Sequence, residues 1–353
     1  DAEITKNKHK NHALYSDKER MNYVSGLGEI FENYREKIYS SGFSTFEKLS
    51  LNKLESFLSK ICSQFNETIF DNRKDNGLFD AYNTINIDSK NQSIDIKKLD
   101  LMLEGQVAGL SCESQKPYST SSTLKSLFSS NLYRADMKSF ILYPEKKITP
   151  FLNKNIIDPD HLKKSILLRK MVDQKNTSIV EQDSDGNFRF NPKFRNIFDL
   201  INALKQLPKS EIEDIPFEKE LEYISNIYEL VFNHRNFTGR SGTMFSYEGI
   251  GSIYWHMVSK LLLATQENYF FAKKQNLADQ QLIQDLGNYY YKIRNGLSAS
   301  KSPQEYGAFP YDPYSHTPSH SGAQQPGMTG QVKEEILTRF GELGCRVIDE
   351  KLI

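Results

Sequence analysis

The chain has 353 residues, and its 45 Lys and Arg balance its 45 Asp and Glu, so the formal net charge is zero. This balance argues against a nucleic-acid partner, and the lack of an apolar run of about eighteen residues argues against a membrane span. The 22 Phe and 19 Tyr supply enough apolar area for a sizeable core.

The three cysteines are far apart in the sequence and odd in number: Cys62, Cys112 and Cys345. Their spacing predicts buried thiols rather than a disulfide framework or a zinc site, and no metal or other cofactor is expected. The first residues lack the apolar core of a signal peptide, which favours a cytoplasmic location and leaves secretion open.

Helical periodicity begins after residues 1–20, which are charged and weakly apolar and are expected to be loosely ordered. Apolar residues then recur every three and four positions, first from Leu27 to Ile38 and next from Leu54 to Phe65. Further helices are predicted over residues 93–112, 121–133, 159–172, 194–208 and 218–236, with a small hairpin over residues 176–191. The pattern predicts a mainly α protein of about eight to ten helices.

The helix lengths vary and the loops are long, and no solenoid repeat is visible. These features favour a helical toroid, built like an (α/α)-barrel, or part of one, with a minor β-hairpin. We expect residues 21–353 to form a single mainly helical domain. The last nine residues, from Cys345, look like the start of a hairpin that is cut short, so we expect the chain to be a portion of a larger protein.

A glycine-rich loop over residues 239–251 precedes the most unusual predicted helix. Within its apolar run, residues Glu248, Ser252, His256 and Lys260 are spaced by four, which predicts one polar stripe. The aromatic residues Tyr247, Tyr254 and Trp255 flank this stripe, and aromatic rings beside carboxylates are typical of sugar-binding clefts. An ordinary solvated helix face, with His256 hydrogen-bonded to a neighbour, remains the alternative.

Residues 311–331 concentrate polar side chains in a segment without helical or strand periodicity. Its prolines favour a rigid loop, and a helix is predicted from Thr329 to Gly344, with Glu335 paired to Arg339 and an N-terminus suited to an anion. This helix is expected to bury three apolar side chains, Val332, Ile336 and Phe340. A metal pair of His316 and His320 is disfavoured because Pro318 interrupts a helix there, and a Ser315–His316 nucleophile pair lacks a nucleophile elbow.

Two earlier segments also place polar residues among apolar ones. Glu104 follows three apolar residues, so it either points inward, where its pKa would rise, or faces solvent. The other polar residues of interest are Asp80, Tyr82, Asn83, Gln106, Arg134, Asp136 and Tyr143.

Six motifs resemble the C-terminal part of a family of large, poorly characterised bacterial proteins, similar in style to (α/α)-barrel glycoside hydrolases and phosphorylases. The motifs are NGLFDAYN at 76–83, MLEGQVAGLS at 102–111, LYRADMKSFILYPEKKITPFLNKN at 132–155, FNPKFRN at 190–196, YEGIGSIYWHMVSKLLLA at 247–264 and the long stretch YGAFPYDPYSHTPSHSGAQQPGMTGQVKEEILTRFGELG at 306–344. The resemblance extends from about residue 22 to the end. The family pattern has His at the position of Asp80 and Thr at that of Tyr311, so specificity or activity would differ here if either residue touches substrate.

Together, the residues and the resemblance imply a carbohydrate-active enzyme, a glycoside hydrolase or phosphorylase that acts on an oligosaccharide with carboxylate acid/base chemistry, and with phosphate in the phosphorylase case. The expected catalytic residues are Glu248, Asp312 and Glu104. The expected substrate-binding residues are Tyr247, Trp255, His256, Arg294, Lys301, Tyr314, His316, His320, Gln324 and Gln325. The alternatives are a non-catalytic carbohydrate- or partner-binding helical domain and an assembly domain that contacts other domains of the same protein.

Overall fold

The computed structural model describes residues 16–42, 48–99, 101–112, 117–144, 149–233, 251–275, 279–319, 321–327, 330–348 and 350–352. Contacts divide the chain into two compact units: unit 1 comprises Asp1–Pro144 and Gly251–Ile353, and unit 2 comprises Glu145–Ile250. Buried apolar residues form a core in each unit. The single mainly helical domain expected over residues 21–353 stays a prediction.

The described residues form thirteen α-helices and several small sheets, which confirms the mainly α class. They show no closed toroid. The helices of unit 1 are α2 (Asp17–Ser41), α3 (Leu51–Asp71), α4 (Leu103–Ser111), α5 (Pro117–Phe128), α11 (Trp255–Lys274), α12 (Gln280–Arg294), α13 (Pro303–Tyr306) and α14 (Gly330–Glu342). Those of unit 2 are α6 (Pro159–Lys164), α7 (Ile166–Asp173), α8 (Ile197–Lys205), α9 (Lys209–Ile212) and α10 (Phe217–Phe232). None of the described helices is long and apolar enough to cross a membrane.

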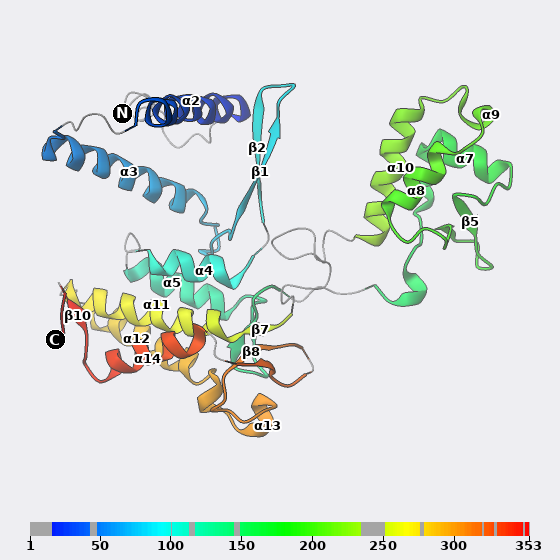
Figure 1. Cartoon of the computed structure of the whole chain (residues 1–353). Helices are drawn as coiled ribbons and strands as arrows, with labels where there is room; N and C mark the ends of the chain where they lie inside the picture. Colours follow the sequence, from blue (N-terminus) through cyan, green and yellow to red (C-terminus); the bar gives the residue numbers. More distant parts are fainter. Residues whose placement is uncertain are drawn as a thin grey trace. The chain divides into compact units, whose positions relative to one another are not determined.

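Helix α11 is the centre of the unit 1 core, where it packs on α4, α5, α12 and α14 (Figure 1). Helix α4 approaches the segment before β1 closely, because a Cβ at Gly105 would lie 2.7 Å from Ala81 Cα and one at Gly109 would lie 2.6 Å from the Phe79 ring. The buried Gln106 side chain completes this contact, since its amide accepts from the Phe79 N–H and donates to the Phe79 carbonyl. Only glycine fits at these two positions of α4.

Residues 83–98 form a hairpin rather than the start of a helix. Strand β1 (Asn83–Asp88) pairs antiparallel with β2 (Ser93–Lys98), and α4 begins only at Leu103. Isoleucines alternate with polar residues in both strands, which is the period of a strand rather than of a helix. The predicted helix over residues 93–112 was therefore wrong in its first half and right in its second.

Residues 253–326 contribute a three-stranded antiparallel sheet of β7 (Ile253–Tyr254), β8 (Tyr314–Thr317) and β9 (Gln324–Pro326). Residues 311–331, which were expected to form an irregular loop, thus supply the two strands β8 and β9. Its prolines suit this arrangement, because Pro313 and Pro318 flank β8 and Pro326 ends the edge strand β9. Two shorter hairpins also lie in unit 1. Strand β3 (Tyr133–Arg134) pairs with β4 (Ser139–Phe140), and β10 (Val347–Ile348) pairs with β11 (Lys351–Leu352). The β10–β11 pair confirms the predicted C-terminal hairpin.

Helix α14 buries the opposite face from the one predicted. Ile336 and Phe340 are about half exposed, whereas Gln331, Glu334, Thr338 and Gly341 are buried. Small residues let α14 approach α11, because a Cβ at Gly341 would lie 2.3 Å from Gln266 Oε1. Gln266 then donates to the Thr338 carbonyl at 2.8 Å. Arg339 pairs with Glu342 rather than with Glu335.

The N-terminal helices α2 and α3 bury no residue at all. Helix α2 begins with a capping box between Ser16 and Glu19, and Arg20 attaches it to the hairpin by donating from Nε to the Ile94 carbonyl at 2.8 Å. Helical periodicity was predicted correctly for both helices. Most of their apolar side chains, however, remain exposed to solvent.

Unit 2 has a continuous apolar core that includes Leu168, Phe190, Leu204, Ile224 and Tyr228, each at most 2 % exposed. Its predicted hairpin is confirmed as β5 (Val180–Gln182) and β6 (Phe188–Phe190). The predicted helix over residues 159–172 breaks at Ser165, whose hydroxyl caps α7.

The buried carboxylate of Glu220 binds the start of α7. It accepts hydrogen bonds from Ser165 Oγ at 2.5 Å, Ile166 N at 3.1 Å and Leu167 N at 3.3 Å. Three donors at a helix N-terminus compensate for the burial of this charge.

Candidate functional site

Three polar side chains form a row across the β7–β8–β9 sheet. Tyr254 on β7 is the register partner of His316 on β8, and His316 is the partner of Gln324 on β9. Register partners lie on the same face of a sheet. The His316 and Tyr254 rings are accordingly stacked, with centroids 4.9 Å apart and planes 14° apart.

The imidazole of His316 is oriented by its neighbours. Its Nδ1 lies 2.6 Å from Ser315 Oγ and 3.2 Å from Gln325 Oε1. The amide oxygen of Gln325 only accepts, which favours the tautomer with the proton on Nδ1 and leaves Nε2 as an acceptor. Burial lowers the pKa of His316, so the ring is neutral at pH 7 and suited to bind a hydroxyl group.

His256, in the first turn of α11, lies beside this row. Its Nδ1 is 3.4 Å from the Tyr254 hydroxyl, and its Nε2 is 3.7 Å from Glu334 Oε1. Burial lowers the pKa of His256, the Lys260 charge adds to this effect, and the Glu334 carboxylate opposes it. In the described part of the chain, Nε2 is buried without a hydrogen-bond partner. Buried polar atoms rarely lack a partner in folded proteins, which makes this atom a candidate for contact with a ligand.

The start of α14 packs directly against His256. A Cβ at Gly330 would lie 2.3 Å from the His256 ring, so only glycine fits at the first residue of this helix. The first N–H groups of a thirteen-residue helix have no intrahelical acceptor and favour an anion. The helix N-terminus supplies hydrogen-bond donors at this corner beside the sheet, where the Glu334 carboxylate also lies close to His256.

Several predicted site residues lie near the row. Tyr314 is half-buried at the start of β8 with its ring edge-on to Tyr306 at 5.9 Å, and Gln324 and Gln325 are exposed on β9. Asp312 is exposed two residues before β8. Trp255 instead lies fully buried behind the sheet, where its Nε1 donates to Thr317 Oγ1 at 2.9 Å and its ring packs edge-on against Tyr306.

Two predicted cationic residues are engaged elsewhere. Arg294 is 8 % exposed between α12 and α14, with its Nε 3.1 Å from Glu342 Oε1. Lys301 is equally buried and donates to the Met137 carbonyl in the β3–β4 turn. Burial lowers the pKa of Lys301. Both side chains hold elements of unit 1 together.

Glu104 lies in the first turn of α4 and accepts a hydrogen bond of 2.6 Å from the Tyr82 hydroxyl. The start of α4 is connected to the strand β7, because Leu103 N donates to the Leu142 carbonyl and Leu142 N donates to the Ser252 carbonyl. Asp80, the position at which the resembled family has His, pairs with Lys74 at 2.8 Å and Lys98 at 3.1 Å.

Three predicted site residues, Tyr247, Glu248 and His320, lie outside the described residues. The predicted polar stripe over positions 248–260 also changes, because α11 begins at Trp255 and Ser252 precedes it. Tyr254 was predicted only as an aromatic residue that flanks the stripe, and Glu334 was not predicted as a candidate site residue. The alternation of Tyr254 with buried Ile253 and Trp255 is the signal that could have placed it on the exposed face of a strand.

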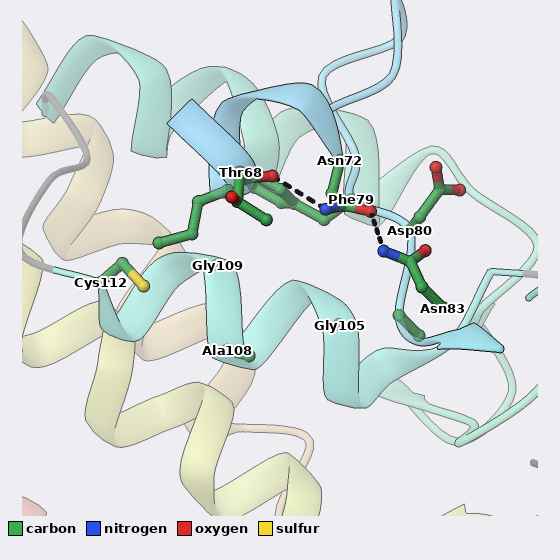
Figure 2. A pocket seen from close by; sticks show the side chains of 11 residues that line it. Thr68, Asn72, Phe79, Asp80, Asn83, Gly105, Ala108, Gly109 and Cys112 are labelled. Carbon is green, nitrogen blue, oxygen red and sulfur yellow. Dashed lines mark hydrogen bonds between the residues drawn. The ribbon is translucent and has the colours of Figure 1, made fainter. Parts of the chain in front are cut away.

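A separate cavity of 180 Å³ lies between the end of α3 and the small-residue face of α4 (Figure 2). Asn83 Nδ2 donates to Asn72 Oδ1 at 3.1 Å along one wall. Thr68, Phe79, Asp80, Gly105, Gly109 and Cys112 also line it. Among the described residues, no group of three His, Cys, Asp or Glu side chains could hold a metal ion, here or elsewhere.

Comparison with known proteins matches one segment of the chain to a known domain. Residues 148–235 match the sequence model of GH149 phosphorylase insertion domain 2. No curated protein matches the chain. The matched segment falls within unit 2, so the domain seen in the fold and the domain recognised in the sequence coincide. The chain thus carries a domain similar to an insertion domain of GH149 phosphorylases, a family of carbohydrate-active enzymes.

Proposed function

We propose that the protein is a phosphorylase that cleaves a glycosidic bond of an oligosaccharide with inorganic phosphate. The observation that carries this proposal is the match of residues 148–235 to a phosphorylase insertion domain. The match favours phosphorolysis over hydrolysis, which the sequence alone left equal. The polar row on the β7–β9 sheet supports it, because it offers neutral hydrogen-bonding groups beside a helix N-terminus.

In this reaction an oxygen of phosphate forms a bond to the anomeric carbon while the bond to the leaving oxygen breaks. A carboxylic acid of the protein donates its proton to the leaving oxygen, so the products are a sugar 1-phosphate and a shortened oligosaccharide. Phosphate is itself a charged nucleophile, so no general base is needed. One acid and a phosphate site therefore suffice.

We assign the phosphate to the corner formed by His256 and the first turn of α14. The helix N–H groups supply donors to an anion, and the Nε2 atom of His256 lacks a partner in the described part of the chain. His316, Tyr254 and Gln324 would bind hydroxyl groups of the sugar, since they are fixed on neighbouring strands.

The acid is assigned to Glu248 first, Asp312 second and Glu104 third. Asp312 lies two residues before β8, and the Glu104 helix is joined through Leu142 to the start of β7. The expectation that this chain forms part of a helical toroid also stays a prediction.

The test is phosphate-dependent release of sugar 1-phosphate from a panel of oligosaccharides, compared between the protein and its Glu248→Gln, Asp312→Asn and Glu104→Gln variants. Loss of the acid lowers turnover by about 10²–10⁴-fold, and circular dichroism checks that each variant is folded. Full activity in all three variants would overturn the assignment of the acid. Binding of oligosaccharide without turnover by the unmodified protein would instead support a binding module.

A further inference from the structure

Helices α2 and α3 expose apolar stripes of the same length and period. On α2 the stripe has the spacing three, four, three, four, and the exposed fractions are 50 % for Val24, 39 % for Leu27, 65 % for Phe31 and 59 % for Tyr34, with Ile38 partly buried. On α3 the same spacing runs through Leu51, Leu54, Leu58, Ile61 and Phe65, of which Leu51 is 79 % and Phe65 is 64 % exposed. This spacing is the seam of a coiled coil.

The two stripes match each other in one antiparallel register. An antiparallel seam places each a position of one helix opposite a d position of the other. The resulting pairs are Ile38 with Leu54, Tyr34 with Leu58, Phe31 with Ile61 and Leu27 with Phe65. The next pair is Val24 with Thr68, and Thr68 lies at the wall of the 180 Å³ cavity.

The residues that flank this seam are compatible with the register. Arg35 comes opposite Glu55, which gives a pair of opposite charge, and Gly28 comes opposite Cys62. No charges of the same sign meet across the seam. Arg35 now pairs with Glu32 of its own helix, an exposed contact that costs little to exchange.

The connection between the helices favours pairing within one chain. The nine residues between Ser41 and Leu51 reach at most about 32 Å, whereas the 25 residues of α2 extend about 38 Å. A parallel arrangement would need the connection to return along the full length of α2. An antiparallel hairpin needs only a turn.

We propose that α2 and α3 close into an antiparallel two-helix coiled coil, in which each helix covers the apolar stripe of the other. In the structure, α2 is attached to the β1–β2 hairpin by Arg20, which donates to the Ile94 carbonyl. Closure moves Arg20 toward Asn72 and away from Ile94, so the two attachments exclude each other. Closure also brings Val24 to the cavity wall at Thr68, which makes α2 a cover for this cavity.

The experiment uses the native Cys62, which is exposed on α3, and a Gly28→Cys substitution in the full chain with Cys112 and Cys345 replaced by serine. A Cβ at Gly28 meets no atom within 4 Å, so the substitution is tolerated in the structure. The matched control is Glu29→Cys, the adjacent residue, which faces away from the seam. A short bismaleimide reagent probes both proteins, and a denaturing gel separates intrachain from interchain products.

Closure predicts intrachain crosslinking of the Gly28→Cys protein at least about tenfold faster than in the control, because the two thiols share a high effective concentration. The additional substitution Phe31→Asp should remove this difference, and it leaves the open form intact because Phe31 is exposed there. Equal rates for the two positions would overturn the proposal. Products of twice the chain mass alone would overturn it too, since they would show that a second copy covers the stripe.

Discussion

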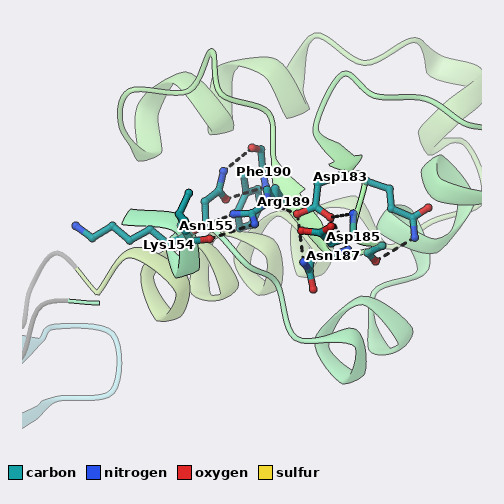
Figure 3. Close-up of polar contacts among 10 residues, drawn as sticks. Lys154, Asn155, Asp183, Asp185, Asn187, Arg189 and Phe190 are labelled. Atoms are coloured by element: carbon teal, nitrogen blue, oxygen red, sulfur yellow. Dashed lines mark hydrogen bonds and ion pairs between the residues drawn. The ribbon is translucent and has the colours of Figure 1, made fainter. Parts of the chain in front are cut away.

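Two polar clusters, one in each unit, differ in whether their hydrogen-bonding groups have partners. In unit 2, residues of its own hairpin donate four hydrogen bonds to the Asp183 carboxylate. Oδ1 accepts from Asp185 N and Asn187 N, and Oδ2 accepts from Asn187 Nδ2 and Arg189 Nε (Figure 3). In unit 1, the row across the β7–β9 sheet leaves His256 Nε2 buried without a hydrogen-bond partner in the described part of the chain. The number of polar residues does not separate these clusters. What separates them is whether their hydrogen bonds are already satisfied.

The Asp183 cluster also ties the hairpin to the segment before it. Arg189 donates to the Lys154 carbonyl at 2.7 Å, and Asn155 exchanges two hydrogen bonds with the Phe190 backbone, as Figure 3 shows. These contacts build the fold of unit 2. We therefore expect substitutions in unit 2 to change stability and substitutions in the row to change activity.

The largest expected effect on stability is that of Glu220→Ala. Removal of the buried carboxylate leaves Ser165 and two N–H groups of α7 without their acceptor, which should cost about 3 kcal/mol of unfolding free energy. Glu222→Ala on the exposed face of the same helix is the control, with an expected change near zero. Urea unfolding measures both. A loss in Glu220→Ala no larger than that of the control would contradict the role of this contact.

The corresponding change in unit 1 is His316→Ala. It removes a group that we assign to sugar binding, so phosphorolysis should fall about 100-fold while the urea midpoint changes little. Asp183→Asn is the paired variant, which should retain activity. A variant of His316 with full turnover, or a loss of turnover in Asp183→Asn, would break the contrast between the two clusters.

A smaller effect is expected in acid. The hydrogen bonds from Arg189 and Asn187 lower the pKa of Asp183 to about 2, below the value of about 3.9 for an unfolded chain. A lowered pKa means that this group stabilises the fold above its unfolded pKa and that the contribution disappears as the pH falls toward 2. Unfolding experiments between pH 5 and pH 2 should show a shallower loss of stability in Asp183→Asn. An unchanged slope would disprove the assignment.

The smallest effect concerns the two histidines of unit 1. Burial lowers the pKa of both His256 and His316, so the folded state binds their protons less readily than the unfolded chain does. Their neutral forms stabilise the fold above the unfolded value of about 6.5, and this stability is lost as the pH falls through the lowered pKa values. His316→Gln should reduce that loss in thermal unfolding scans below pH 6.5. A steeper loss in the variant would contradict it.

The sequence predicted local structure best where one periodicity dominates. The stripes of α2 and α3 and the hairpin of unit 2 are of this kind. It failed where tertiary contacts decide: α14 buries Glu334 and Thr338 rather than Ile336 and Phe340, because small residues let the helix approach α11. Strands β8 and β9 are short and polar, and β9 consists of two glutamines and a proline, so only their pairing with β7 and with each other reveals them.

The candidate site was predictable in part for the same reason. Residue type pointed to His256, His316 and Gln324. The sheet pairs His316 with Gln324, and His256 lies beside Tyr254 of the same sheet. Residue type also pointed to Trp255, Arg294 and Lys301, and these lie buried in contacts that hold unit 1 together. Whether a side chain is buried depends on the whole fold, so a local sequence pattern does not predict it.

The central claim is phosphorolysis, and the most direct measurement is the identity of the product formed from an oligosaccharide in the presence and absence of phosphate. Phosphorus NMR should show a sugar 1-phosphate that appears only with phosphate, in an amount equal to the glycosidic bonds cleaved. Release of free sugar at the same rate without phosphate would contradict the account.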